Sequence, residues 1–231
     1  VITGSIDDEV TLFEKRSALP QRLQAPADEM VAMMFEQPWM PFEQAYDVVF
    51  GARGVATGAW QLASAVWRYV IAAVNRRRRI SIITAVQGIE TDVWGAPSWE
   101  PHCAGSVRYR GSFEYSDSPR ILAGAKVALA WGPTQFSHAF SERVLLAMGA
   151  GCATVVDDRL LVRSRLGDGV ERFDSRDPAS ANRAVRALLD NNDQRAALAD
   201  RGRAIVERAH LWSHRVPHFV AAAEEAIRTP V

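Results

Sequence analysis

Lysine, cysteine and an excess of either charge are what this sequence has least of. Lys15 and Lys126 are the only lysines among 27 basic residues, and 27 acidic residues bring the formal net charge to zero. That balance argues against nucleic acid as a partner and excludes a dominant electrostatic attraction to an anionic membrane. Cys103 and Cys152 are too few for a disulfide framework and have no metal-ligand spacing.

No signal peptide is visible in the sequence either. The sequence begins at Val1, without the charged segment and apolar stretch that mark such a peptide. We therefore expect a cytoplasmic protein, and a piece of a longer polypeptide because the first residue is not Met. Its 231 residues, 48% of them hydrophobic, suffice for one packed domain or one and a half small ones.

Residues 1–44 show little periodicity. Methionines, aromatics and prolines are mixed between Ala25 and Pro41, and the pattern predicts only a short helix over Asp28–Phe35, ended before Pro38. We expect this segment to be a linker or the remnant of a preceding domain. Residues 45–231 are then the main domain.

In that main domain, short apolar runs alternate with helical patterns. The predicted strands are 46–50, 91–95, 107–111, 126–131, 153–156 and 170–173, and the predicted helices are 60–88, 118–125, 140–148, a helix from Pro178, 193–209 and 214–227. Near-continuous apolar strands separated by helices are typical of a parallel sheet covered on both faces. The sequence therefore predicts an α/β domain with a doubly wound, Rossmann-like parallel sheet and a helical C-terminal tail.

Ligands of such sheets bind beyond the carboxyl ends of the strands, where two loops are candidates. The first follows the strand predicted at 46–50 and contains Gly51, Gly54 and Gly58. Gly51 and Gly54 let a ligand approach the backbone or simply turn the chain, and the turn is the safer interpretation because no GxGxxG or P-loop pattern is present. The second loop, 132–143, leads into the helix 140–148.

The start of that helix is a candidate phosphate site. A helix N-terminus offers free N–H groups and a positive partial charge. Ser137 or Ser141 could add a hydroxyl there, and Arg143 could bind phosphate oxygens with two N–H groups. The plainer alternative is that Ser141 caps the helix, Glu142 favours its dipole and Arg143 is solvated.

His138 precedes the same helix and is the candidate catalytic residue. An imidazole there could act as a general base or as a hydrogen-bond donor near a leaving group, or could merely bond to the backbone. His214 and His218 share a helical face, but no carboxylate or cysteine joins them as a metal ligand. We expect a surface or capping role for these two.

Four consecutive arginines, Arg76–Arg79, end the long predicted helix. They fit a core helix with a solvated basic end, an interfacial membrane helix with a polybasic flank, or a nucleic-acid patch. Arg68 is too costly for a membrane-spanning segment, and no basic–aromatic interleaving supports nucleic acid. The core helix is favoured, with peripheral membrane contact as the minority alternative.

An ordered set of motifs resembles one family of enzymes. The run Phe140–Val156 (FSERVLLAMGAGCATVV), with 48–54, 91–95, 107–111, 168–173 and 212–215 around it, is similar to GT-B glycosyltransferases. The resemblance covers about 46–231 and is strongest to the group-1 branch that includes spore-maturation CgeB-like proteins. It implies the C-terminal, donor-binding half of two facing Rossmann-like domains, with the N-terminal domain missing here.

The resemblance also implies an activity, namely transfer of a sugar from a nucleoside-diphosphate-sugar to an unknown acceptor without a cofactor or a metal ion. In many group-1 enzymes a glutamate just before Ala-Met holds the ribose, and another acidic residue lies eight positions earlier. Here these places are Leu146 and His138. Glu142, on the same helical face as Leu146, is a possible substitute. The alternative is a non-catalytic, degenerate Rossmann-like binding or scaffold domain.

Overall fold

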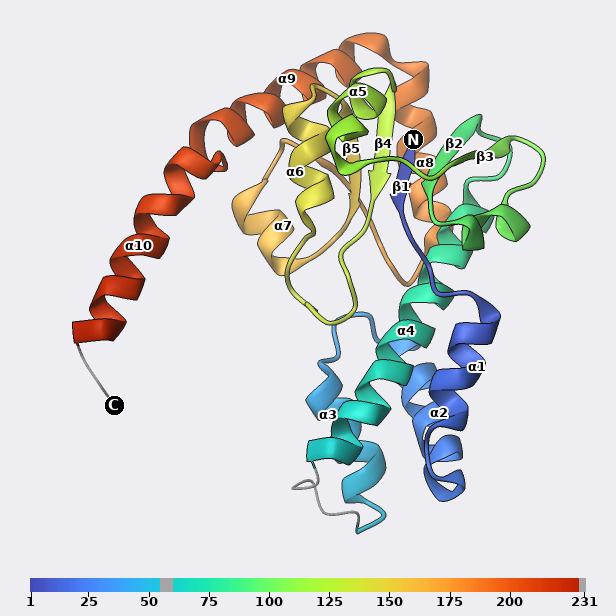
Figure 1. The fold of residues 1–231 in the computed structure, drawn as a ribbon. Coiled ribbons are helices and arrows are strands. Elements are labelled where there is room, and N and C mark those ends of the chain that lie inside the picture. Colours follow the sequence, from blue (N-terminus) through green and yellow to red (C-terminus); the bar gives the residue numbers. More distant parts are fainter. Residues whose placement is uncertain (55–59, 229–231) are drawn as a thin grey trace.

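Six parallel strands form the centre of the molecule (Figure 1). The computed structural model describes residues 1–54 and 60–228. The strands are β1 (Ile2–Gly4), β2 (Thr91–Gly95), β3 (Val107–Gly111), β4 (Val127–Ala130), β5 (Ala153–Asp157) and β6 (Glu171–Phe173). They make two three-stranded sheets, β1-β2-β3 and β4-β5-β6, with every pairing parallel.

Val1 joins the two sheets edge to edge. Its nitrogen donates to the carbonyl of Val127 at 2.6 Å, and its carbonyl accepts from the nitrogen of Leu129 at 2.9 Å. The resulting strand order, 3-2-1-4-5-6, is that of a doubly wound dinucleotide-binding sheet. From β1 the chain adds β2 and β3 on one side of the sheet, and it then adds β4, β5 and β6 on the other side. In sheets of this class the ligand crevice lies at this change of side, at the carboxyl ends of β1 and β4.

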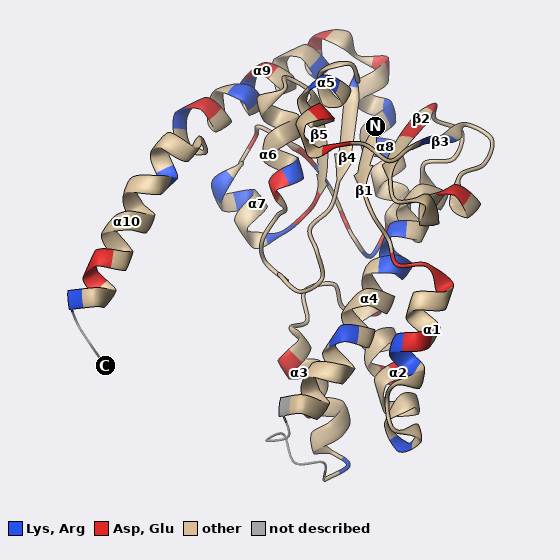
Figure 2. Ribbon diagram, in the orientation of Figure 1, with Lys and Arg blue, Asp and Glu red and all other residues tan. Residues whose placement is uncertain are grey.

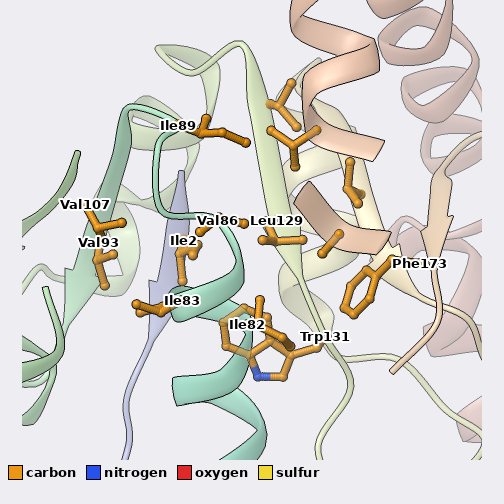
Figure 3. Packing of buried hydrophobic residues seen from close by; sticks show 14 of the residues in the cluster. Ile2, Ile82, Ile83, Val86, Ile89, Val93, Val107, Leu129, Trp131 and Phe173 are labelled. Carbon is orange, nitrogen blue, oxygen red and sulfur yellow. The ribbon is translucent and has the colours of Figure 1, made fainter. Parts of the chain in front are cut away.

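Helices cover both faces of this sheet. On one face α4 (Trp60–Ala85) and α8 (Pro178–Asp190) bury the main core, in which Ile82 and Ile83 pack near Leu129 and Trp131 (Figure 3). The other face is covered by α5 (Ser118–Ala123), α6 (Glu142–Gly149), α7 (Leu160–Arg165) and α9 (Asn192–Ala209). The predicted doubly wound, Rossmann-like fold is confirmed.

A helical insertion fills the connection between β1 and β2. It consists of α1 (Glu9–Ser17), α2 (Gln21–Glu36), α3 (Phe42–Tyr46), a π-helical turn (Asp47–Gly51) and most of α4. All of these elements except α1 share a separate apolar core around Met30, Met34, Phe50 and Val70. Figure 1 shows the insertion beyond the end of the sheet at which the strands finish.

The strand predicted at 46–50 is wrong. These residues are helical, and Val49 and Phe50 are buried in the core of the insertion. A short apolar run fits a buried helix as well as a buried strand, and only its surroundings decide. Gly51 and Gly54 are consequently exposed at the far end of the insertion, while Gly58 lies outside the described residues.

The actual first strand is β1, in the segment 1–44 that was expected to be a linker or remnant. The same segment holds α1 and α2, and α2 runs from Gln21 to Glu36 with Pro26 inside it instead of covering only 28–35. Pro26 lies in the second turn, where it costs the helix one backbone hydrogen bond, and its ring is buried in the insertion core.

Two short 3₁₀ segments, Pro97–His102 and Tyr115–Asp117, lie in the connections around β3, and α10 (Trp212–Arg228) forms the predicted helical tail. Helix α10 leaves the body of the domain, and none of its residues is buried (Figure 1). Within residues 1–54 and 60–228, no helix combines the length and the apolar character needed to cross a bilayer.

Candidate functional site

A cavity of about 320 Å³ opens where β1, β2 and β3 end and α6 begins. Its walls come from the ends of these strands, from the loop after β3, and from α5 and α6. The lining residues include Gly4, Ser5, Gly95, Phe113, Tyr115, Ser118, Glu142, Arg143 and Leu146. This is the crevice at the reversal of strand order, where the topology alone places a ligand.

The amino end of α6 faces this crevice. Ser141 is its N-cap residue, with extended backbone angles (φ −84°, ψ 160°), but its side chain makes no capping hydrogen bond. The side chain is only 7% exposed, and its Oγ has no partner among the described residues. A buried hydroxyl without a hydrogen-bond partner is costly, so the Ser141 hydroxyl is suited to a ligand that accepts its hydrogen bond.

Arg143 in the first turn of α6 points toward the end of β1. Its guanidinium lies against Gly4, where a Cβ would be 3.5 Å from Cζ, and Gly4 has a φ of +135° that favours glycine. A second, much smaller cavity of about 10 Å³ shares Thr3 and Arg143 with the first and adds Arg79 and Ser141. The smaller cavity is thus lined by Arg79, Ser141 and Arg143 together.

Arg79 is the residue that sequence analysis missed. It comes from α4, and its guanidinium lies 6.0 Å from the ring centre of Trp131, the residue after β4. Burial lowers the pKa of Arg79 to about 10, and repulsion from Arg143 contributes to the lowering. Neither guanidinium has a hydrogen-bond acceptor or an acidic partner within residues 1–54 and 60–228.

The block Arg76–Arg79 is therefore not a solvated basic end, as the favoured interpretation expected. Basic residues of α4 gather where the helix passes the sheet (Figure 2). Arg76 donates to the Asp7 carbonyl and pairs with Glu9, Arg77 lies over the Phe35 ring, and Arg78 donates to Thr134 and to the Met34 carbonyl. The four arginines of this helical turn therefore contact different parts of the molecule. Of the four, only Arg79 lines the candidate site.

The residues predicted from sequence fall into three groups. Ser141, Glu142 and Arg143 line the two cavities, and Leu146 lies one turn beyond Glu142 in the same wall. Ser137 and His138 belong to the loop after β4 but line neither cavity, and the His138 backbone carbonyl accepts from Leu161 at 3.0 Å. The His138 side chain is exposed.

Gly51 and Gly54 are not part of this arrangement. They were candidates for ligand binding because they follow an expected strand, although a plain turn was the safer interpretation, and that strand is a helix. The glycines that lie beside the ligand crevice are Gly4 and Gly95, the last residues of β1 and β2, and sequence analysis did not single out Gly4. Its signal, an apolar Val-Ile-Thr followed by glycine, stands at the very start of the sequence.

Metal-ligating side chains do not cluster in the part of the chain that the structure describes. There, no group of three or more His, Cys, Asp and Glu residues is close enough to share an ion. Positive charge in the crevice comes instead from Arg79, Arg143 and the amino end of α6.

Comparison with known proteins assigns the chain to a family. A family model described as glycosyl transferase-like matches residues 73–221, which is more than half of the chain. The match begins in α4, six residues before Arg79, and runs through β2–β6 and α6 into α10. A search of curated proteins returns no similar sequence. With its doubly wound sheet and its cationic crevice at the ends of β1 and β4, this chain belongs to the glycosyl transferase-like family.

Proposed function

We propose that this chain is the donor-binding domain of a GT-B glycosyltransferase of the group-1, CgeB-like branch, and that it takes a nucleoside-diphosphate-sugar as donor. The observation that carries the proposal is a pair of guanidinium groups at the end of β1 that have no ion-pair partner among the described residues. Arg79 and Arg143 repel each other there, and the Ser141 hydroxyl next to them is unpartnered. A diphosphate would supply acceptors for all three groups at once.

The same charge suits the chemistry of sugar transfer. When the bond from the sugar to the diphosphate breaks, the departing diphosphate gains negative charge. Arg79, Arg143 and the N–H groups of α6 are already oriented, so they stabilise this charge without reorganisation. We propose on this basis that the reaction needs no resident metal ion or cofactor, since arginines take the role of the cation.

The ribose and the sugar would occupy the wall formed by the first turns of α6. Glu142 lies four residues before Leu146, and both line the cavity of about 320 Å³. We assign to Glu142 the ribose hydroxyls that leucine cannot bind. His138 is the candidate for contact with the sugar or the acceptor, because its exposed side chain lies on the loop between β4 and α6.

The acceptor and the second Rossmann-like domain are further parts of the proposal. In a GT-B enzyme the acceptor is held by the N-terminal domain, which faces the donor across a cleft. We propose a cytoplasmic enzyme of this kind, with peripheral membrane contact through the outer part of α4 as an additional possibility. Vesicle sedimentation with anionic lipid tests that contact, and failure to co-pellet excludes it.

Calorimetric titration with UDP and with GDP tests the donor site. We expect saturable binding of at least one of them, and we expect Arg143→Gln to weaken it by about tenfold or more, since a charge-assisted pair with phosphate contributes roughly 1.5–3 kcal/mol. Arg183→Gln is the matched control, because Arg183 is exposed on α8 and, among the described residues, pairs with Asp177 alone. If neither nucleotide binds, the non-catalytic scaffold is the better description, which Leu146 in place of glutamate favours.

A further inference from the structure

A buried ion pair lies at the carboxyl end of β5, outside the two cavities. Asp157 is the last residue of β5, and its Oδ2 accepts from Nε of Arg159 at 2.6 Å. Both side chains are only 2% exposed. Removing two charges from water costs more than such a pair usually returns in stability, so the pair needs an explanation other than the stability of the fold.

The guanidinium of Arg159 donates hydrogen bonds to backbone carbonyls along the loop between β4 and α6. Its Nη2 donates to the Gly132 carbonyl at 2.7 Å, and its Nη1 lies within hydrogen-bond distance of three more carbonyls, those of Pro133, Phe136 and Ala139. Asp157 completes the arrangement, because its Oδ1 accepts from the Gly132 nitrogen at 2.7 Å. One ion pair thus holds both ends and the middle of the loop.

Gly132 shows how closely the guanidinium and the loop fit. A Cβ at this position would be 2.5 Å from Cζ of Arg159 and 2.7 Å from the Ala139 carbonyl oxygen, closer than packed atoms approach. The chain can pass over the guanidinium only because residue 132 has no side chain. The backbone of the loop is therefore in close van der Waals contact with the Arg159 guanidinium at Gly132.

Fewer contacts hold the loop from other directions: Arg78 donates to the Thr134 hydroxyl, and the Leu161 nitrogen donates to the His138 carbonyl. The loop's internal backbone hydrogen bonds are two turns, from Phe136 to the Pro133 carbonyl and from Ala139 to the Phe136 carbonyl. Thr134 is bound to Asn75 of α4, and the loop then leads directly into Ser141 and the amino end of α6. The orientation of that helix end thus depends on a loop whose carbonyls converge on one side chain.

We propose that Arg159 is a positioning residue for the donor. All of its acceptors are protein atoms, in contrast to Arg79 and Arg143, so it acts through the loop and not on the ligand. It fixes the residues from Gly132 to Ser141 in the one conformation that presents the Ser141 hydroxyl and the α6 N–H groups to the diphosphate. The inference rests on the proposed function only for the identity of the ligand.

Arg159→Lys is the variant that tests this role. Lysine keeps a positive charge beside the buried Asp157, so the fold is retained, but a single ammonium group cannot span four carbonyls. Arg163→Lys is the matched control, because Arg163 stands four residues on and pairs with Asp158, with a side chain 63% exposed. Two measurements on both variants and the parent chain decide the question.

Hydrogen exchange without ligand is the first measurement. In Arg159→Lys we expect the amides of Gly132, Phe136 and Ala139 to exchange at least about tenfold faster, while the amides of β4 and β5 keep their protection and the thermal midpoint stays within a few degrees of the parent's. Unchanged loop protection would overturn the proposal. If all amides lose protection together, Arg159 maintains the fold as a whole, which also overturns it.

Titration with UDP is the second measurement. A loop that is ordered about a tenth of the time raises the apparent Kd about tenfold, and we expect at least that for Arg159→Lys and no change for Arg163→Lys. Faster loop exchange with unchanged affinity would overturn the positioning role. If the parent chain binds neither UDP nor GDP, the proposed function fails, whereas the exchange experiment still decides whether Arg159 orders the loop.

Discussion

Arg79→Met is expected to stabilise the protein while it weakens donor binding. Arg79 holds a charge in a partly buried place beside Arg143. It has no ion-pair partner among the described residues, and the attraction of the more distant Asp7 is weaker than the repulsion of Arg143. A residue that serves only the fold would not be kept in such surroundings. A residue kept for an anionic ligand would be, because the ligand removes the repulsion.

The size of the effect follows from the charge. The pKa of Arg79 is lowered to about 10 by burial and by Arg143, which at about 1.36 kcal/mol per pKa unit corresponds to roughly 3 kcal/mol of unfavourable interaction. Solvent at the crevice screens part of this, and methionine gives up the contact with Trp131. We therefore expect a gain of about 1–2 kcal/mol in the free energy of unfolding, or roughly 2–8 °C in the thermal midpoint.

Two assays on the same protein test the prediction. Thermal unfolding without ligand gives the stability, and calorimetric titration with UDP or GDP gives the affinity, which should fall at least about tenfold. Arg77→Met is the control on the same helix, because Arg77 is exposed over the Phe35 ring and lines neither cavity. A drop in stability for Arg79→Met would refute the reasoning, since Arg79 would then be a structural residue with favourable partners.

Further substitutions probe the ribose contact, the strand ends and the response to acid. Glu142→Gln should lower nucleotide affinity by about threefold to tenfold, and unchanged affinity would exclude Glu142 as the group that binds the ribose. Gly95→Ala should destabilise the chain by about 3 kcal/mol or more in urea unfolding, because a Cβ there would be 1.5 Å from the Gly4 carbonyl oxygen and φ is +153°. A loss of less than about 1 kcal/mol would contradict this close approach of the two strand ends. Burial and the nearby Arg76 lower the pKa of His102 below 6.5, so the unfolded chain takes up the proton first and stability falls as the pH drops below about 6.5. His102→Asn should flatten that part of a plot of thermal midpoint against pH, and an identical slope would contradict the assignment.

The strands and helices after residue 90 follow from the sequence because their patterns are local. Thr91–Gly95 and Val107–Gly111 were predicted with the bounds that the structure has, and the helix of Glu142 and Arg143 was placed within two residues. Each of these elements lies between recognisable turn residues, and its hydrophobic residues recur with a single period from end to end. Local patterns were enough there to predict both the fold class and one wall of the site.

The other wall of the site depends on contacts between distant residues. β1 has only three residues, too few for a periodic signal, and it is a strand because β2 and β4 flank it. Arg79 was recognisable as a cation, but its place over Trp131 depends on a helix that crosses from the insertion to the sheet. Arg159 has no local signal either, since the carbonyls it binds lie 20 to 27 positions away.

Helix α4 belongs to two cores at once. Val66, Val70 and Val74 near its beginning are buried in the core of the insertion, whereas Ile82 and Ile83 near its end are buried against the sheet. At 1.5 Å per residue its 26 residues make one rod about 39 Å long. Arg78 and Arg79 stand where this rod passes from one core to the other. The insertion and the cationic crevice are therefore built on one continuous helix, and a deletion of the insertion would shorten the helix that carries Arg79.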